Sequence, residues 1–182
     1  MDIPIIANEL CIRPFAENDV AAFVSAVHES APTVGAWMPW CVATYSEADA
    51  RSWFELCLSR LRAGSAYDLG VFGANGVDLY GGVAINQINI SYRTGNIGYW
   101  VRQSRHRQGV ATRAVRSIAA YGLKQLKLKR LEIVVAEKNL ASRAVAEKVG
   151  AVLECIAPDR LVMGQRAMPA AVYVITPGLK GF

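Results

Sequence analysis

The sequence predicts an α/β fold in which a mixed, mostly antiparallel sheet of seven strands carries four helices on its faces. Three observations support this prediction: helical spacing of apolar residues in four segments, strand-like runs in seven others, and turn residues between consecutive central strands. The predicted order is β, α, α, β, β, β, α, β, α, β, β. Because no repeat, low-complexity segment or linker divides the chain, residues 1–182 are expected to form a single domain.

The first third of the chain is predicted to be mainly helical. Leu10–Phe15 alternates like a strand and includes a proline near its end. Glu17–Ser30 has apolar residues at helical spacing. After the loop Ala31–Tyr45, Ser46–Ala63 begins with a serine N-cap and has Asp49 three positions later, which is the pattern of a capping box.

Strands and helices alternate in the remainder. The predicted strands are Tyr67–Phe72, Leu79–Ser91, Asn96–Val101, Arg130–Ala136, Ala151–Ala157 and Ala170–Thr176. Turn residues join the first three into an antiparallel meander. Two further helices are expected at Gly109–Lys127 and Asn139–Val149, and Pro158–Pro169 is expected to connect the last two strands.

Composition limits the classes of function. The chain has 53% hydrophobic residues, 19% charged residues and a net charge of +5, which favours an anionic ligand without selecting nucleic acid. There is no run of about 18 apolar residues and no leader pattern, so a cytoplasmic protein without a membrane partner is expected. Cys11, Cys41, Cys57 and Cys155 lie far apart and only two histidines are present, which predicts buried free thiols and no metal site.

The stretch RHRQGVATRA, Arg105 to Ala114, predicts an anion site. A strand ends near Val101 and a helix opens at Gly109, so backbone N–H groups without helical acceptors converge beside Arg105 and Arg107. A diphosphate is the expected ligand, and a solvated basic turn is the alternative. The chain has no GxxxxGK[ST], GxGxxG or GxSxG motif, so common nucleotide loops and a nucleophile elbow are not supported.

The segments YWVRQSRHRQGVATRAV and NLASRAVAEKVGAVLEC resemble the GNAT superfamily of N-acetyltransferases, within it the RimJ/RimL-like branch that acetylates N-terminal amino groups of ribosomal proteins. The likeness covers nearly the whole chain and is most specific from Gly98 to Glu154. It implies splayed central strands and an acetyl-CoA loop. That loop maps to His106, Arg107, Gln108, Gly109, Val110 and Ala111, followed by Thr112. His106 replaces the usual Arg or Gln, and Arg107 replaces a frequent Gly.

The resemblance also implies how the pantetheine is bound. The backbone of Tyr99, Trp100 and Val101 would bond it like an added strand, with a backbone N–H near Val101 stabilising the oxyanion. Core packing is the alternative for the two aromatic rings. Asn139 is expected to cap its helix and to contact the pantetheine as well.

Two residues are candidates for the chemistry. By resemblance, Ser142 hydrogen-bonds the CoA thiol and protonates the departing thiolate; a hydrogen bond within its own helix is the alternative. Glu154 is the candidate general base, on a strand whose apolar neighbours are expected to raise its pKa, against the alternative of a surface or ion-paired glutamate. An α-amino group is already partly neutral at physiological pH, so a strong base is not required.

Trp37, Met38 and Trp40 in the long loop are expected to line the acceptor groove, unless the loop simply folds over the core. The predicted function is acetyl-CoA-dependent transfer of acetyl to a primary amine, foremost a protein N-terminus, by direct attack in a ternary complex. Alternatives are an acetyltransferase for a small amine, a CoA-binding module without catalysis, and a basic nucleic-acid binder. The expected partners are acetyl-CoA and an amine acceptor, without nucleic acid, for a monomer or homodimer.

Overall fold

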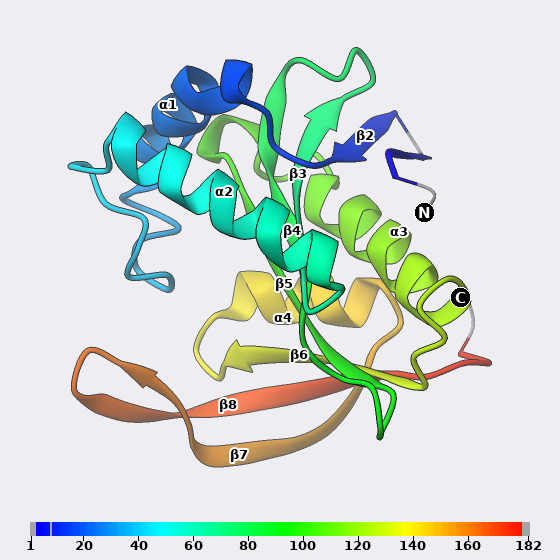
Figure 1. Cartoon of the computed structure of the whole chain (residues 1–182). Coiled ribbons are helices and arrows are strands. Elements are labelled where there is room, and N and C mark those ends of the chain that lie inside the picture. The colour runs from blue at the N-terminus through cyan, green and yellow to red at the C-terminus, as the bar shows by residue number, and fades with distance from the viewer. Residues whose placement is uncertain (1–2, 8, 180–182) are drawn as a thin grey trace.

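The computed structural model describes residues 3–7 and 9–179, whose strands form one mixed sheet in the order β1-β2-β3-β4-β5-β6-β8-β7 (Figure 1). The strands are β1 Ile5–Ala7, β2 Leu10–Arg13, β3 Tyr67–Gly73, β4 Leu79–Asn89, β5 Thr94–Val101, β6 Arg130–Ala136, β7 Val152–Met163 and β8 Arg166–Ile175. The α-helices are α1 Val20–Ser30, α2 Glu47–Ala63, α3 Val110–Lys124 and α4 Leu140–Lys148, with short 3-10 turns at Glu17–Asp19 and Gln103–Arg105.

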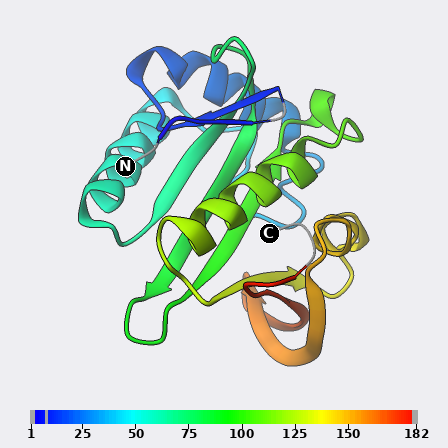
Figure 2. The same ribbon diagram turned by 90° about the vertical axis from the view of Figure 1, so that its right-hand side faces the viewer.

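The two central strands separate along their length. β5 and β6 are parallel, whereas every other neighbouring pair in the sheet is antiparallel. Their pairing runs only from Thr94 to Asn96 on β5, opposite Arg130 to Glu132 on β6. Beyond that point the strands diverge, as Figure 2 shows. The expected splay of the central strands is therefore confirmed, and it leaves one edge of β5 without a partner strand.

Helices cover both faces of the sheet (Figure 2). The side chains of α1 and α2, such as Phe23 and Phe54, pack with Phe72 of β3 in one apolar cluster. Val115 and Ile118 of α3 belong to the cluster on the other face, with the apolar residues of the central strands. Alternation along each strand thus assigns its side chains to one of two cores.

Local sequence fixes where the helices begin. Ser46 Oγ accepts a hydrogen bond from Asp49 N at 3.1 Å, and the Asp49 carboxylate accepts one from Ser46 N at 2.8 Å, so the expected capping box is present. At α4, Asn139 Oδ1 accepts from Ser142 N at 3.1 Å. Asn139 is therefore the predicted N-cap, and it orients the first turn of α4.

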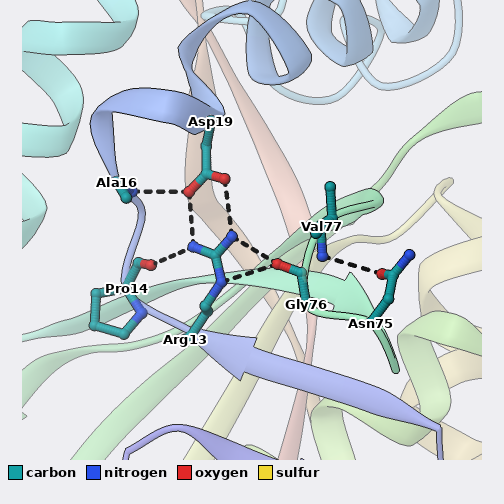
Figure 3. A network of polar contacts seen from close by, with 7 residues as sticks. All are labelled: Arg13, Pro14, Ala16, Asp19, Asn75, Gly76 and Val77. Atoms are coloured by element: carbon teal, nitrogen blue, oxygen red, sulfur yellow. Dashed lines mark hydrogen bonds and ion pairs between the residues drawn. The ribbon is translucent and has the colours of Figure 1, made fainter.

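Arg13, at the end of β2, ties the start of α1 to the β3–β4 turn (Figure 3). Its guanidinium donates to both carboxylate oxygens of Asp19, at 2.7 and 2.8 Å, and to the carbonyl oxygen of Gly76 at 2.8 Å. Asp19 is buried and also accepts from Ala16 N at 2.8 Å. A charged pair that is largely removed from water thus holds three segments together.

Three predictions of detail are wrong. Within the described residues the sheet has eight strands, because the three-residue β1 adds to the edge of β2. The segment Pro158–Pro169, predicted as a connection, mostly belongs to β7 and β8, which form a long hairpin. Both prolines lie where the pairing register shifts, so the N–H that proline lacks is not needed for a hydrogen bond of the ladder. The thiols of Cys11, Cys41 and Cys57 are free and buried, but Cys155 is exposed on β7.

Candidate active site

A cleft of about 750 Å³ lies between the first turn of α3, the end of β5, α4 and the loop after α1. Arg113 N makes the first amide hydrogen bond of the helix, to Gly109 O at 3.0 Å. The N–H groups of Val110, Ala111 and Thr112 therefore precede any helical acceptor, and all three residues line the cleft. Such a helix start can bind a diphosphate.

Gly109 caps α3 in a left-handed conformation, with φ of 72°. A Cβ built at this position would meet no atom within 4 Å, so the glycine faces open space. The conformation favours glycine, and the missing side chain lets a ligand approach the backbone. Both features support the expected role of this turn in holding phosphate groups.

Three basic side chains, from Arg105, Arg107 and Lys148, share this cleft with the helix start, and His106 also lines it. The guanidinium of Arg105 lies over the ring of Tyr80, 4.3 Å from its centroid, which fixes its direction. Together with the helix start, these groups favour an anionic ligand.

Glu29, at the end of α1, anchors the segment that precedes the turn. Its carboxylate accepts from Ser104 N at 2.6 Å and forms an ion pair with Arg102. Ser30 Oγ accepts from Gln103 N at 3.1 Å. Burial acts to raise the pKa of Glu29, but the hydrogen bonds from Ser104 and Arg102 outweigh it and lower the pKa. The carboxylate therefore stays ionised, and it holds the segment before Gly109 against α1.

The open edge of β5 presents backbone groups to the cleft. Arg102 N donates to Tyr80 O at 2.8 Å, so these two residues form a hydrogen-bonded pair at the end of the β5–β4 ladder. Because such pairs alternate along an antiparallel ladder, Val101 and Tyr99 occupy positions without hydrogen bonds to β4. Their N–H and C=O groups consequently point away from β4. The Val101 carbonyl accepts from His106 Nε2 at 2.8 Å, whereas the Val101 N–H faces the cleft side. This edge can pair with an extended ligand such as pantetheine.

A pair of hydroxyl groups joins β5 to α4. Tyr99 Oη donates to Ser142 O at 2.9 Å and lies 2.8 Å from Ser142 Oγ, with either hydroxyl able to donate. Burial raises the pKa of Tyr99 to about 12, although the hydrogen bond with Ser142 acts in the opposite direction. Tyr99 is thus a neutral donor at physiological pH. If the Tyr99 ring only filled the core, its hydroxyl would have no reason to contact Ser142.

A second cavity, of about 320 Å³, lies on the α1–α2 face of the sheet. The floor is made of small residues, Gly82, Ala84 and Gly98, on two adjacent strands. The aromatic side chains in its lining belong to Phe15, Phe23, Trp40, Tyr45, Trp53, Tyr99 and Trp100. Because Met38, Tyr99 and Trp100 line both spaces, the cleft and this aromatic pocket adjoin.

The predicted site residues fall mainly on these two cavities. Of the residues expected to bind the cofactor, all but Gln108 line the cleft; Gln108 instead donates from Nε2 to Ser104 O at 3.0 Å. Among the residues expected at the acceptor groove, Trp37 lines the cleft, Trp40 lines the aromatic pocket and Met38 lines both.

The expected environment of Glu154 is wrong. Its carboxylate is half-exposed and accepts two hydrogen bonds from Arg130, at 2.8 and 2.6 Å. The hydrogen bonds from Arg130 lower the pKa of Glu154 instead of raising it. Glu154 also lines neither cavity. The apolar neighbours in the sequence do not surround its side chain, because β7 is an edge strand with its side chains largely exposed.

Sequence reasoning missed two charged residues that line the cavities. Lys148 lines the cleft near the end of α4, and Asp68 is buried in the aromatic pocket. The signal for Asp68 was one charged residue inside the otherwise uncharged strand YDLGVFG.

Across residues 3–7 and 9–179, no cluster of three or more His, Cys, Asp or Glu could hold a metal ion. Nor does any helix in those ranges have the length and apolar character needed to cross a membrane.

In this arrangement a strand leaves its neighbour beside an open helix start and turns its free edge into a cleft. Such a cleft suits an extended ligand with a diphosphate, as CoA is, and therefore the class of acyl-transfer enzymes. The family model described as "Acetyltransferase (GNAT) domain" matches residues 9–152. The chain belongs to this family. It is an N-acetyltransferase whose acetyl donor is acetyl-CoA.

Two curated relatives and a solved structure are similar to this chain over most of its length. The "Putative ribosomal N-acetyltransferase YdaF" of Bacillus subtilis (strain 168) is 26% identical over 163 residues, covering 86% of this chain and 85% of the relative. The ribosomal-protein-serine acetyltransferase of Escherichia coli (strain K12) is 24% identical over 149 residues, with 82% of each chain covered. The structure of RimL, a ribosomal L7/L12 α-N-protein acetyltransferase, in complex with coenzyme A superposes with a TM-score of 0.86 at 20% identity, over 96% of this chain and 98% of the other.

Proposed function

We propose that this acetyltransferase acts on the N-terminal α-amino group of a protein, a ribosomal protein being the leading candidate, within a ternary complex. One observation carries the proposal: a cleft that suits CoA adjoins a separate aromatic pocket at Met38, Tyr99 and Trp100. The names of the two ribosomal-acetyltransferase relatives support the protein acceptor. Such an acceptor would place the reaction in the cytoplasm.

The donor is assigned to the cleft on the α3 side. The first turn of α3 holds the diphosphate, with Arg105, Arg107 and Lys148 beside it. The pantetheine follows the free edge of β5 toward Ser142, because that edge offers the unpaired groups of Tyr99 and Val101. The acetyl group then reaches the junction of the two cavities.

Transfer proceeds by direct attack. The lone pair of the neutral amine adds to the thioester carbonyl carbon, so that a C–N bond forms and the carbonyl oxygen becomes an oxyanion near the Val101 N–H. Collapse breaks the C–S bond and releases CoA thiolate. No cysteine of the described chain lines either cavity, which argues against a cysteine-bound acetyl intermediate.

The hydroxyl pair supplies the proton for the leaving thiolate. Ser142 Oγ donates its proton to the sulfur and recovers the proton that the amine loses, while Tyr99 Oη, 2.8 Å away, orients the serine hydroxyl and stays neutral. No general base is required, because an α-amino group with a pKa of about 8 is partly neutral at pH 7. A base role for Glu154 stays a prediction.

The test is a screen of acceptors with purified enzyme and acetyl-CoA. Peptides copying ribosomal-protein N-termini, the same peptides with a blocked α-amine, and single-amine compounds are compared, and mass spectrometry locates the acetyl group. Acetylation of the free peptides at the α-amine supports the proposal. Acetylation of small amines with all peptides inert would overturn it.

An acceptor of low molecular weight is the second candidate. The observation that favours it is the aromatic pocket itself, which at about 320 Å³ suits a small ligand or a single side chain better than a length of chain. The same screen separates the two candidates.

A further inference from the structure

Asp68 occupies an unusual position for a carboxylate. It lies on β3 and is 7% exposed, and in the described part of the chain its Oδ2 atom has no hydrogen-bond donor. Arg60 Nη1 forms a long ion pair with this oxygen at 3.7 Å, beyond hydrogen-bond distance, from a side chain that is 42% exposed. A buried carboxylate oxygen left in this state is costly unless a positive group completes its environment.

The pocket around Asp68 suits such a group. Among the described residues that line it, Asp68 is the one charged side chain, and most of the others are aromatic or apolar. Aromatic faces attract cations, and a carboxylate at the wall adds a point of attachment. Burial raises the pKa of Asp68 while Arg60 acts to lower it, so a bound cation would favour the ionised form.

Strand register places Asp68 relative to the reacting centre. Asp68 pairs with Ala84, which in turn pairs with Gly98 on β5, so the three residues form one row across the sheet. Two strand spacings, about 10 Å, separate β3 from β5. A Cβ built on Gly98 would have only Asn86 Nδ2 within 4 Å, at 3.8 Å, so the pocket floor over Gly98 is open. Asp68 is therefore too far to contact an amine at the edge of β5, but it can reach a second group on the same acceptor.

We propose that Asp68 is a specificity-determining residue that binds a second, positively charged group of the acceptor. The inference rests on the proposed function and names its substrate class: an amine that also carries a guanidinium or ammonium group at the end of a slender apolar chain. An N-terminal residue with a basic side chain has this form, since its α-amine would meet the acetyl group while its side chain extends along the pocket floor to Asp68.

The experiment compares two matched acceptor pairs. The first is a peptide beginning with arginine and the same peptide beginning with citrulline, the neutral analogue of arginine, which offers the enzyme the same α-amine. The second is agmatine and butylamine, which carry a primary amine with and without a guanidinium. For each pair the ratio of kcat/KM values is measured with the wild type, Asp68→Asn and Arg60→Gln.

The wild type is expected to prefer the cationic member of a pair by about tenfold or more, as for a hydrogen bond to a charged group. Asp68→Asn should bring the ratio close to one, while binding of acetyl-CoA, measured by calorimetry, stays unchanged and shows that the variant is folded. Arg60→Gln should keep or increase the preference, because it removes the cation that is paired with Asp68. If Asp68 served only as a structural partner of Arg60, neither variant would change the ratio.

The results separate the two proposals. Acetylation of both peptides with a ratio near one, or with a ratio that Asp68→Asn leaves unchanged, would overturn the role of Asp68 and leave N-terminal acetylation standing. A preference for agmatine that depends on Asp68, with these peptides and all those of the acceptor screen inert, would support the inference and reject the protein acceptor. Acetylation of neither cationic acceptor would overturn the inference.

Discussion

Ser142 and Tyr99 form a hydrogen-bonded pair that links the free edge of β5 to α4, and single substitutions test its role. Ser142→Ala is expected to lower kcat about 100-fold, because the leaving thiolate loses its proton donor. The KM for acetyl-CoA should change little, since the diphosphate and pantetheine contacts lie elsewhere. Steady-state kinetics with varied acetyl-CoA give both values.

A second serine provides the matched control. Ser117 lies in α3, its Oγ donates to Arg113 O at 3.0 Å, and it lines neither cavity. Ser117→Ala should leave kcat unchanged. Equal values of kcat for Ser142→Ala and the wild type would assign Ser142 to helix packing alone.

Gly109→Glu is expected to abolish binding of acetyl-CoA. The replacement forces a side chain into a left-handed backbone position, with φ of 72°, and adds a negative charge where the diphosphate lies. Calorimetric titration with acetyl-CoA measures the loss. Gly164 in the β7–β8 turn, with φ of 62° and equally open surroundings, is the control for backbone strain alone. Retained affinity in Gly109→Glu would remove the diphosphate from this turn.

The pH profile distinguishes a neutral acceptor from a catalytic base. The value of kcat/KM should rise with pH up to about 8, the pKa of an α-amino group, and the rise should move with the pKa of the acceptor chosen. No decline is expected below pH about 10, because burial raises the pKa of Tyr99 to about 12 and keeps its proton in place. Glu154→Gln should give the same profile. A rising limb that disappears in this variant would restore Glu154 as the base.

At the scale of elements, Arg13 tests how the helices are attached to the sheet. Arg13→Ala leaves the buried Asp19 without its charged partner and frees the β3–β4 turn, so unfolding free energy should fall by about 3 kcal/mol. Urea denaturation followed by circular dichroism measures the change. Arg51, which forms ion pairs with Glu17 and Glu47 on the surface, is the control whose alanine variant should be nearly as stable as the wild type. If Arg13→Ala changed the unfolding free energy only slightly, water would replace Arg13 as the partner of Asp19 at no cost in stability.

Elements with strong local signals were predictable from the sequence. The start of α3 at Gly109 and the cap of α4 at Asn139 follow from glycine and N-cap chemistry within a few residues. β1 was missed because three residues carry no periodicity, and its pairing with β2 is a tertiary contact. The ends of β7 and β8 were missed because proline usually argues against a strand, and the register shift that admits it cannot be seen locally.

At the scale of the whole molecule, the site depends on which strands become neighbours. The strand order β6-β8-β7 brings Arg130 close to Glu154, 24 residues away in sequence. The carboxylate of Glu154 is therefore paired with Arg130 and does not have the apolar environment that its sequence neighbours suggest. No sequence motif surrounds Asp68. Its place in the aromatic pocket follows from the pairing of β3 with β4 and of β4 with β5, which aligns Asp68, Ala84 and Gly98. The donor side was predictable because one continuous segment builds most of it, whereas the acceptor side combines β3, β4, β5 and the two helices before them.

The central claim is that donor and acceptor occupy two adjoining cavities and react directly at their junction. Initial-velocity kinetics test it most directly, with acetyl-CoA and the best acceptor from the screen varied against each other. The account predicts intersecting lines in double-reciprocal plots, because both substrates must be bound before acetyl transfer. Parallel lines, together with an acetylated enzyme isolated in the absence of acceptor, would contradict it.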